Sequence, residues 1–248
     1  MRVEELTDAD AQREAAHLLG SIWDAPVVAP ALLRAVGYSG GYVAGAYDGA
    51  ELLGAAVGFL GAGGHLHAHV AGVTAARRGT SVGFGLKQHQ RTWALARGIS
   101  RVYWTYDPLI RSNASFNLRR LGALPVRYLQ DFYGPMTDGV NAGDETDRLY
   151  MAWDLTDPRV VLAAAGTRAE VSDEGAEPLL DEAGTLTPNG TRRLTVALPA
   201  DITALRATDP AAASRWRHAV RTALLGAFDD GYLITGLTRR GHYLLELS

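Results

Sequence analysis

Three histidines alternate along one predicted strand and lead toward a glycine-bearing turn. His65, His67 and His69 share one face of this strand, whose other face is apolar. Because histidine titrates near neutral pH, His67 or His69 is a candidate general base. Successive side chains on one strand face lie about 7 Å apart, so chelation of a single metal ion by all three is awkward and we expect no metal. A solvated or hydrogen-bonded histidine face is the alternative.

The turn after this strand leads directly into an amphipathic helix. Apolar residues repeat at a period near 3.6 from the predicted N-cap Ser81 until Gly98 ends the helix. The first turn of a helix carries unsatisfied N–H donors, and the helix dipole favours an anion beside them. Arg77 and Arg78 add positive charge at the same place. Residues 72–86 therefore predict an anion-binding site, although such turns often only reverse the chain.

Two aspartates and two tyrosines are further candidates for proton transfer. Asp107 follows the apolar-aromatic run Val102 to Tyr106, at the carboxyl end of a strand predicted over 102–105, where α/β sheets bind ligands, but it is also a typical turn former or helix cap. Asp131 lies in another strand-like segment, either on an exposed edge or facing a pocket that would tune its pKa. Tyr106 and Tyr133 are candidate proton donors, and tyrosine is also common in cores and pocket rims.

Composition limits the classes of function. The chain has 248 residues, 47% of them hydrophobic, which is enough for a real core. A net charge of −3 gives no support for nucleic-acid binding, and the absence of cysteine excludes disulfides, thiolate nucleophiles and zinc–sulfur sites. The charged N-terminus lacks a signal-peptide core and no apolar run reaches membrane-spanning length, so we expect a cytoplasmic protein without a membrane partner. Lys87 is the only lysine.

The order of predicted elements divides the chain into three parts. Strands and helices alternate over residues 1–155, with a predicted hairpin at Asp48-Gly49 and a short helix over 114–120. Residues 156–190 are acidic and rich in glycine and proline, as in a linker or crossing segment. Residues 191–248 read as a strand, a helix and a hairpin, too small to be stable alone. We expect this part to pack on the first domain or on a second copy of the chain, or to hold a small protein partner.

Several segments resemble the GNAT acyltransferase superfamily. Arg78-Gly79-Thr80-Ser81-Val82-Gly83 is similar to its pyrophosphate loop, Arg/Gln-x-x-Gly-x-Gly/Ala, with matches at Arg78 and Gly83 and with Ser81 in place of the middle glycine. Further segments resemble a subgroup of predicted GNAT acetyltransferases without an assigned substrate, over about residues 1–155. They are His67-Ala68-His69, Gln90 to Gly98, Trp104 to Leu109, Asn113 to Leu118, Leu121-Gly122-Ala123, Asp131-Phe132-Tyr133-Gly134, Asn141-Ala142-Gly143 and Asp147-Arg148-Leu149.

The resemblance implies a fold, a cofactor and a reaction. The fold is α/β, a mixed and mostly antiparallel sheet flanked by helices, here with a small C-terminal strand-helix-hairpin extension. The reaction is acyl transfer from acetyl-CoA or another acyl-CoA to a small molecule. The implied cofactor-binding residues are Val73, Arg77, Arg78, Gly79, Thr80, Ser81, Val82, Gly83 and Asn113; the catalytic candidates are His67, His69, Asp107, Asp131 and Tyr133; Trp104 and Tyr106 are expected at the substrate.

Two departures from the family pattern keep other functions open. Ser81 adds a Cβ where the pyrophosphate approaches the backbone, and Leu118 replaces the tyrosine that commonly protonates the CoA thiolate. Either another acid acts, with Tyr133 or water as candidates, or the chemistry has changed. The second hypothesis is an enzyme of specialised-metabolite biosynthesis that performs elimination or cyclisation on a phosphate- or sulfate-bearing substrate. The third is a non-catalytic binding module.

Overall fold

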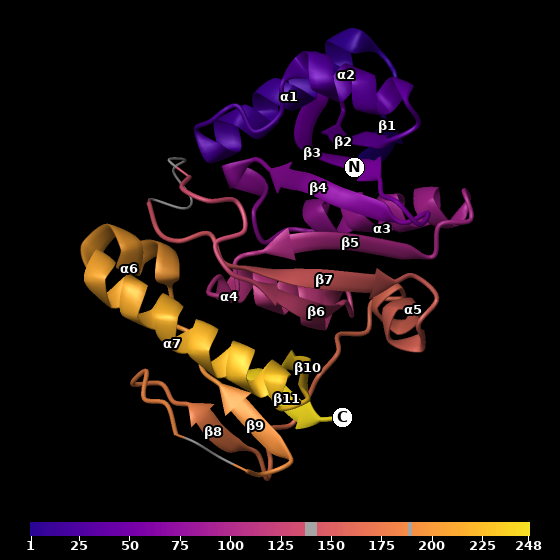
Figure 1. Ribbon diagram of the computed structural model, residues 1–248. Coiled ribbons are helices and arrows are strands. Elements are labelled where there is room, and N and C mark those ends of the chain that lie inside the picture. The colour runs from indigo at the N-terminus through magenta and orange to yellow at the C-terminus, as the bar shows by residue number, and fades with distance from the viewer. Residues whose placement is uncertain (137–142, 188–189) are drawn as a thin grey trace. The chain divides into compact units, whose positions relative to one another are not determined.

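The computed structural model describes residues 1–136, 143–187 and 190–248 (Figure 1). The chain forms two compact units, the first from Met1–Trp104 and Asp154–Thr156, the second from Thr105–Trp153 and Asp157–Ser248. The division into residues 1–155, 156–190 and 191–248 stays a prediction. Residues 141 and 142, part of one family-like segment, lie outside the described residues.

The first unit is built on a sheet with the strand order β1-β2-β3-β4-β5. Neighbouring strands are antiparallel except β4 and β5, which are parallel. In chain order its elements are β1 (Arg2–Glu5), α1 (Ala9–Trp23), α2 (Pro30–Tyr38), β2 (Tyr42–Asp48), β3 (Glu51–Leu60), β4 (Leu66–Val73), the 3-10 turn η1 (Ala75–Arg77), α3 (Val82–Leu95) and β5 (Arg101–Tyr106), whose last two residues belong to the second unit.

Local sequence signals explain the main elements of this unit. The Asp8 carboxylate caps α1 by accepting hydrogen bonds from the backbone N–H groups of Asp10 and Ala11. Gly49 adopts a φ of +59° between β2 and β3, which confirms the predicted hairpin. Tyr42 on β2 lies toward α3, where its hydroxyl donates to the Leu86 carbonyl oxygen over 3.3 Å.

Helices cover both faces of this sheet. Alternate residues of β2 and β3, among them Val43, Ala55 and Val57, form a buried cluster with α1 and α2. The opposite face packs against α3. Strands β2 and β3 are therefore buried on both faces, whereas each helix buries one apolar side, as its period near 3.6 residues predicts.

The second unit contains the antiparallel pair β6–β7 and a four-stranded sheet with the order β10-β11-β9-β8. Helix α7 packs against β8, β9 and β10 of the four-stranded sheet, and β10 contacts β6. Its remaining elements, in chain order, are α4 (Arg111–Ala114), the π-helical turn η2 (Ser115–Arg120), β6 (Leu124–Leu129), β7 (Arg148–Asp154), α5 (Pro158–Ala164), β8 (Glu177–Leu180), β9 (Arg193–Val196), α6 (Ile202–Thr208), α7 (Pro210–Asp229), β10 (Tyr232–Leu237) and β11 (Tyr243–Leu247).

The sequence predictions are confirmed for the fold class and differ in detail elsewhere. The mixed α/β class and the C-terminal strand, helix and hairpin are present. The short helix predicted over 114–120 is instead a single α-turn followed by a π-helical turn. The segment 156–190, read as a linker or crossing segment, contains α5 and β8. In the described part of the chain, no helix has both the length and the apolar character that crossing a membrane requires.

Candidate functional site

The β4–α3 junction has the geometry that the sequence predicts. Strand β4 ends at Val73, the 3-10 turn follows, and Gly79 adopts a φ of +75°, in the left-handed region that favours glycine. A Cβ placed on Gly79 would meet no atom within 4 Å, and one on Gly83 would meet only Val73 Cγ1 at 3.9 Å. The backbone of this loop is therefore open to a ligand.

The N-terminus of α3 lacks the side-chain cap that the sequence suggests. Ser81 is the N-cap residue, as predicted, but its side chain makes no capping hydrogen bond. Thr80 Oγ1 instead lies 3.4 Å from the Val82 nitrogen and donates to the Arg77 carbonyl oxygen over 2.6 Å. Arg78 is exposed beside this N-terminus. Exposed donors, a helix dipole and a guanidinium together favour an anion here.

The histidines of β4 form a cluster with one aromatic side chain. The Phe59 ring stacks on His67 at 4.9 Å between centroids, and the two rings of His67 and His69 lie 6.4 Å apart. Burial lowers the pKa of His67 to about 4, and the nearby His69, His65 and Lys87 add to the shift. Desolvation also lowers the pKa of His69. Both imidazoles are thus held neutral at physiological pH and can accept a proton.

Lys87 on α3, which the sequence analysis did not assign to the site, lies near the histidines of β4. Only 6% of its surface is exposed, and its ammonium donates to Gln90 Oε1 over 3.1 Å. The Nζ atom also lies 3.9 Å from the ring centre of Trp104 on β5, a residue expected at the substrate. Burial lowers the pKa of Lys87 to about 7. No local pattern marks this burial, because Lys87 is a charged residue next to Leu86 in the sequence, and neighbouring residues of a helix point in different directions.

In the second unit, Asp107 is held by two buried arginines. It accepts hydrogen bonds from Arg217 Nη1 and Nη2 over 2.8 and 2.9 Å, and from Arg206 Nη2 over 2.5 Å. Burial alone would raise its pKa, but the two guanidiniums outweigh burial and lower the pKa of Asp107 to about 2. This environment is that of a structural ion pair, and such a carboxylate is a weak base.

Asp131 and Tyr133 are brought together through Thr146. Asp131 has a φ of +42°, and its Oδ1 accepts from the Thr146 nitrogen and hydroxyl, both over 3.1 Å. The Tyr133 nitrogen in turn donates to Thr146 Oγ1 over 3.0 Å. The Tyr133 hydroxyl lies 2.9 Å from Thr105 Oγ1, and the Tyr133 side chain is exposed.

Other predicted residues have different surroundings. Tyr106 is buried, and its hydroxyl lies 2.9 Å from that of Tyr243, so a contact with substrate is not its evident role. Asn113 lies exposed on α4. Leu118 is buried in the π-helical turn. Within the ranges that the structure describes, no three potential ligands come close enough to hold a metal ion.

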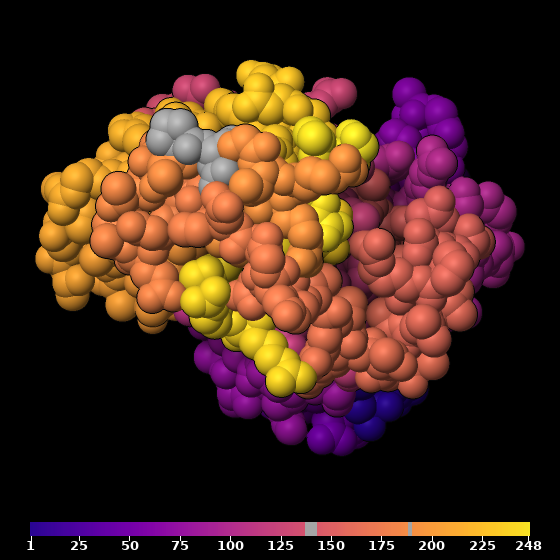
Figure 2. All heavy atoms as spheres, turned by 90° about the horizontal axis from the view of Figure 1, so that it is seen from below, coloured from indigo at the N-terminus to yellow at the C-terminus, as the bar shows by residue number. Residues whose placement is uncertain are grey.

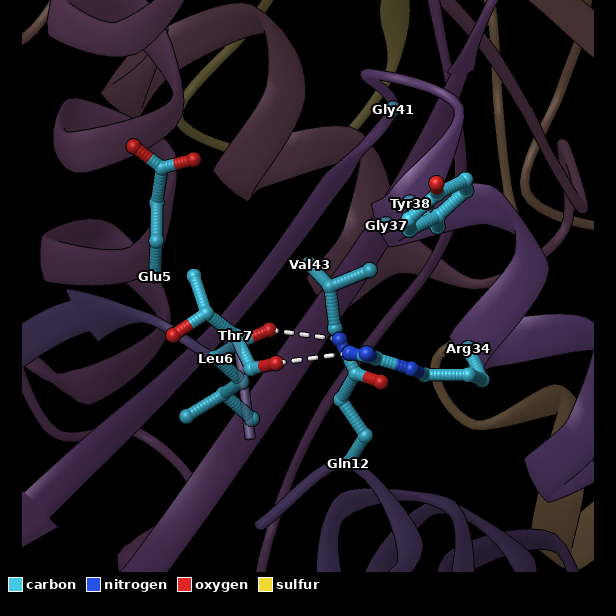
Figure 3. Close-up of a pocket in the computed structure, with 9 residues that line it drawn as sticks. All are labelled: Glu5, Leu6, Thr7, Gln12, Arg34, Gly37, Tyr38, Gly41 and Val43. Atoms are coloured by element: carbon cyan, nitrogen blue, oxygen red, sulfur yellow. Dashed lines mark hydrogen bonds between the residues drawn. The ribbon is translucent and has the colours of Figure 1, made fainter. Parts of the chain in front are cut away.

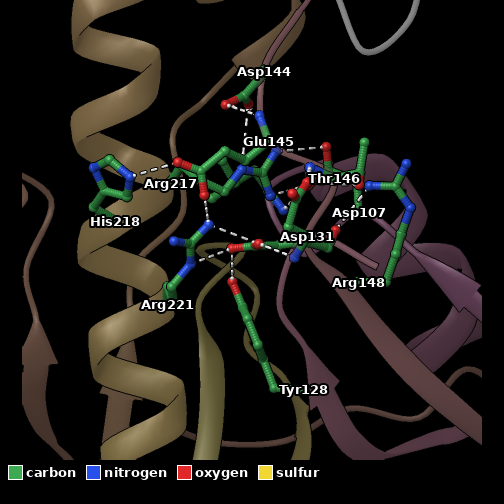
Figure 4. Close-up of polar contacts among 12 residues, drawn as sticks. Asp107, Tyr128, Asp131, Asp144, Glu145, Thr146, Arg148, Arg217, His218 and Arg221 are labelled. Carbon is green, nitrogen blue, oxygen red and sulfur yellow. Dashed lines mark hydrogen bonds and ion pairs between the residues drawn. The ribbon is translucent and has the colours of Figure 1, made fainter. Parts of the chain in front are cut away.

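An acid–arginine network joins the segment 144–147 to helices α6 and α7 (Figure 4). Arg206 and Arg217 both donate to Asp144 Oδ2 over 2.8 Å. Arg221 pairs with Glu145 and donates to Asp147 Oδ1 over 2.8 Å. Figure 4 shows Arg217 and Arg221 reaching from one helix toward these carboxylates. The sequence reading missed this network because its partners lie 62 to 76 residues apart.

Solved structures show what the fold resembles. The sequence matches no family model and no curated protein. The ribosomal-protein-alanine N-acetyltransferase from Brucella melitensis aligns with a TM-score of 0.52 at 14% identity, over 61% of this chain and 98% of that one. An N-acetyltransferase from Staphylococcus aureus Mu50 aligns with a TM-score of 0.52 at 13% identity, over 62% of this chain and 98% of that one. Aminoglycoside 6'-acetyltransferase type Ii aligns with a TM-score of 0.50 at 20% identity, over 62% of this chain and 97% of that one. The chain thus has the GNAT fold.

Proposed function

From a GNAT fold with an open β4–α3 junction, we propose that this chain is an acyltransferase that moves an acyl group from acyl-CoA to a small molecule. The observation that carries the proposal is the junction itself, where Gly79 in the left-handed region and a helix N-terminus without a capping bond from Ser81 lie beside Arg78. Aminoglycoside 6'-acetyltransferase type Ii, which shares the fold, acts on a small molecule by its name, and this supports the acceptor class.

The residues of the junction fit the pyrophosphate of acyl-CoA. Gly79 and Gly83 leave open space at their Cα atoms, so a ligand can approach the backbone closely. Arg78 is exposed beside them and would supply charge, whereas the Thr80 hydroxyl already donates to the Arg77 carbonyl oxygen. Ser81 carries a Cβ where the family pattern has its middle glycine. The bound thioester would supply an activated carbonyl carbon.

His67 is the base that we favour, with His69 as the alternative. The lowered pKa keeps His67 unprotonated at neutral pH and also makes it a weaker base than an ordinary imidazole. Its ring nitrogen would therefore take the proton of an amine or alcohol only as the new bond to carbon forms and makes that proton acidic. Asp107 is disfavoured because its oxygens are occupied by Arg206 and Arg217. Water would return a proton to the leaving sulfur, because Tyr133 and Leu118 belong to the second unit, whereas the junction and His67 belong to the first.

Release of free CoA thiol tests the proposal. Wild-type protein is incubated with acetyl-CoA and a panel of small amines and alcohols, and thiol formation is followed. His67→Ala should lower the rate by about 10² to 10⁴ if this residue is the base, while His65→Ala serves as the matched control on the same strand face. Acetyl-CoA binding without thiol release for any acceptor would favour the binding-module hypothesis. Binding of phosphate or sulfate esters but not of acetyl-CoA would favour elimination or cyclisation.

A further inference from the structure

A cavity lies in the first unit, where β1 runs into α1 and α2 runs into β2 (Figure 3). Its volume is about 320 Å³, at the lower end of the range for small-molecule sites. Its polar lining residues are Glu5, Thr7, Gln12, Arg34 and Tyr38, and none of its lining residues belongs to the β4–α3 junction. The Glu5 carboxylate is already engaged, since it accepts from Trp93 Nε1 over 2.7 Å and from Arg97 Nη2 over 3.5 Å.

Gln12 places a buried acceptor in this cavity. The residue is 1% exposed, and its Nε2 donates to the Leu6 carbonyl oxygen over 2.6 Å, which fixes the orientation of the amide. Among the described residues, its Oε1 has no hydrogen-bond partner. A buried amide oxygen without a partner is costly, so a donor from a bound molecule would satisfy it. Figure 3 shows this oxygen beside the Arg34 side chain.

Arg34 places a cation next to that acceptor. Its Nη1 donates to the Thr7 carbonyl oxygen over 2.7 Å, so the amide of Gln12 and this guanidinium are held by adjacent peptide groups. The Arg34 side chain is exposed, and the Asp8 carboxylate is a charged neighbour: backbone N–H groups lower the pKa of Asp8, and Arg34 adds to that shift. The remaining N–H groups of Arg34 match the two oxygens of a carboxylate. Tyr38, 85% exposed, adds an aromatic surface to the lining.

Two glycines keep the cavity open. A Cβ on Gly37 would lie 2.8 Å from Gln12 Nε2 and would displace the amide. A Cβ on Gly41 would lie 2.6 Å from Val36 Cγ1 and 2.9 Å from the Gly58 carbonyl oxygen. The position of the Gln12 amide therefore depends on the absence of a side chain at residue 37.

We propose that this cavity binds a small carboxylate carrying an N–H or O–H donor on the carbon next to the carboxyl group. The donor satisfies Gln12 Oε1, and the carboxylate pairs with the Arg34 guanidinium. N-acyl amino acids and 2-hydroxy acids have this chemistry. The site is independent of the proposed acyl transfer, because it shares no residue with the β4–α3 junction.

Titration of the full-length protein with N-acetylglycine, followed by ¹H–¹⁵N NMR, tests the site. Shifts are expected at the amides of Thr7, Gly37 and Gly41, and at the side-chain amide of Gln12. Acetamide lacks the carboxylate and acetate lacks the donor, so both should bind more weakly. Arg34→Gln should weaken binding about tenfold, as expected for loss of a charge-assisted hydrogen bond. Arg13→Gln, on the exposed surface of α1, is the matched control.

Gln12→Met removes the acceptor at similar side-chain length, and if it folds, it should weaken N-acetylglycine binding as well. Arg34 is exposed, so Arg34→Gln keeps the test valid even if Gln12→Met does not fold. The proposal is overturned if N-acetylglycine and lactate cause no shifts at millimolar concentration, if the shifts lie outside the cavity, or if Arg34→Gln binds like Arg13→Gln. The first outcome would mean that Gln12 Oε1 is satisfied by water alone.

Discussion

Lys87 shows how a single residue can carry an energetic cost inside the fold. An ammonium in a buried position loses its hydration, and here Gln90 and the ring of Trp104 replace only part of it. The consequence is the lowered pKa, about 7 against 10.5 for an unperturbed lysine. The sequence showed a lone lysine on a helix, but burial depends on the sheet that packs over it, which local periodicity does not specify.

Replacing Lys87 should stabilise the protein in a pH-dependent way. Between pH 10.5 and about 7 the unfolded state binds a proton at this residue that the folded state does not, so stability falls as the pH falls. Lys87→Met removes this penalty, and its melting temperature should exceed that of the wild type by most at and below about pH 7. Thermal melts of both proteins from neutral to alkaline pH measure the difference. A difference that does not change with pH would contradict the burial of a titrating ammonium.

Replacement of Asp107 tests whether this predicted catalytic residue has a structural role. Its two guanidinium partners come from positions 99 and 110 residues further along the chain, so no local pattern could reveal them. Asp107→Asn should cost about 3–5 kcal/mol in the free energy of unfolding, because it leaves buried arginines without their counter-charge. Asp48→Asn, in an exposed ion pair with Arg77, should cost about 0–1 kcal/mol.

The pH dependence of stability provides an independent check on Asp107. Because the pKa of Asp107 is lowered, its contribution to the free energy of unfolding is complete above pH 3.8 and is lost as the pH falls through about 2. Urea unfolding across this range should show a steeper acid loss for the wild type than for Asp107→Asn. Equal slopes, or an Asn variant as stable as the wild type, would show that the ion pairs do not support the fold.

At the scale of elements, the β4–α3 junction was the best predicted part of the molecule. Alternation and a 3.6-residue period identify its strand and helix, and the N-cap position at Ser81 is confirmed. The missing capping bond was not predictable, because it depends on the turn geometry that places Thr80 Oγ1 near the helix start. The π-helical turn at Ser115–Arg120 was missed for a similar reason, since its sequence also suits an α-helix.

Ser81→Gly tests what the serine does at this junction. Because the side chain makes no capping hydrogen bond, its removal should cost only a few tenths of a kcal/mol in stability. The loss of the Cβ should tighten acetyl-CoA binding if the pyrophosphate approaches the backbone here. Calorimetric titration and thermal melts of the two proteins measure both quantities. Weaker binding together with a clear loss of stability would identify Ser81 as a needed part of the site.

At the scale of the whole molecule, long-range contacts decide which parts fold together. The second unit joins residues 105–153 to the C-terminal region, for example through the Tyr243 hydroxyl, which donates to the Pro108 carbonyl oxygen over 2.7 Å. The Arg111 guanidinium donates to the Leu198 carbonyl oxygen over 2.5 Å. The sequence predicted that residues 191–248 need support, but hydrophobic patterning alone does not identify the residues that supply it.

Residues 191–248 expressed alone should not fold cooperatively. Their sheet would lack β8, which pairs in parallel with β9, and Tyr243 would lose its partners Tyr106 and Pro108. The remaining apolar burial is too small to offset chain entropy. Amide dispersion in NMR spectra and a thermal melt, with the full chain as the control, check this. A cooperative transition from the fragment would contradict it.

The central claim is that the β4–α3 junction binds acyl-CoA, and calorimetric titration with acetyl-CoA tests it most directly. The wild type should bind, and Arg78→Ala should weaken binding by about 1.5–3 kcal/mol, the range for hydrogen bonds to charged groups. Arg101→Ala, an exposed arginine paired with Asp154 on the same unit, should bind like the wild type. No heat of binding with the wild type, or equal affinity in Arg78→Ala, would contradict the account and leave the junction as a turn.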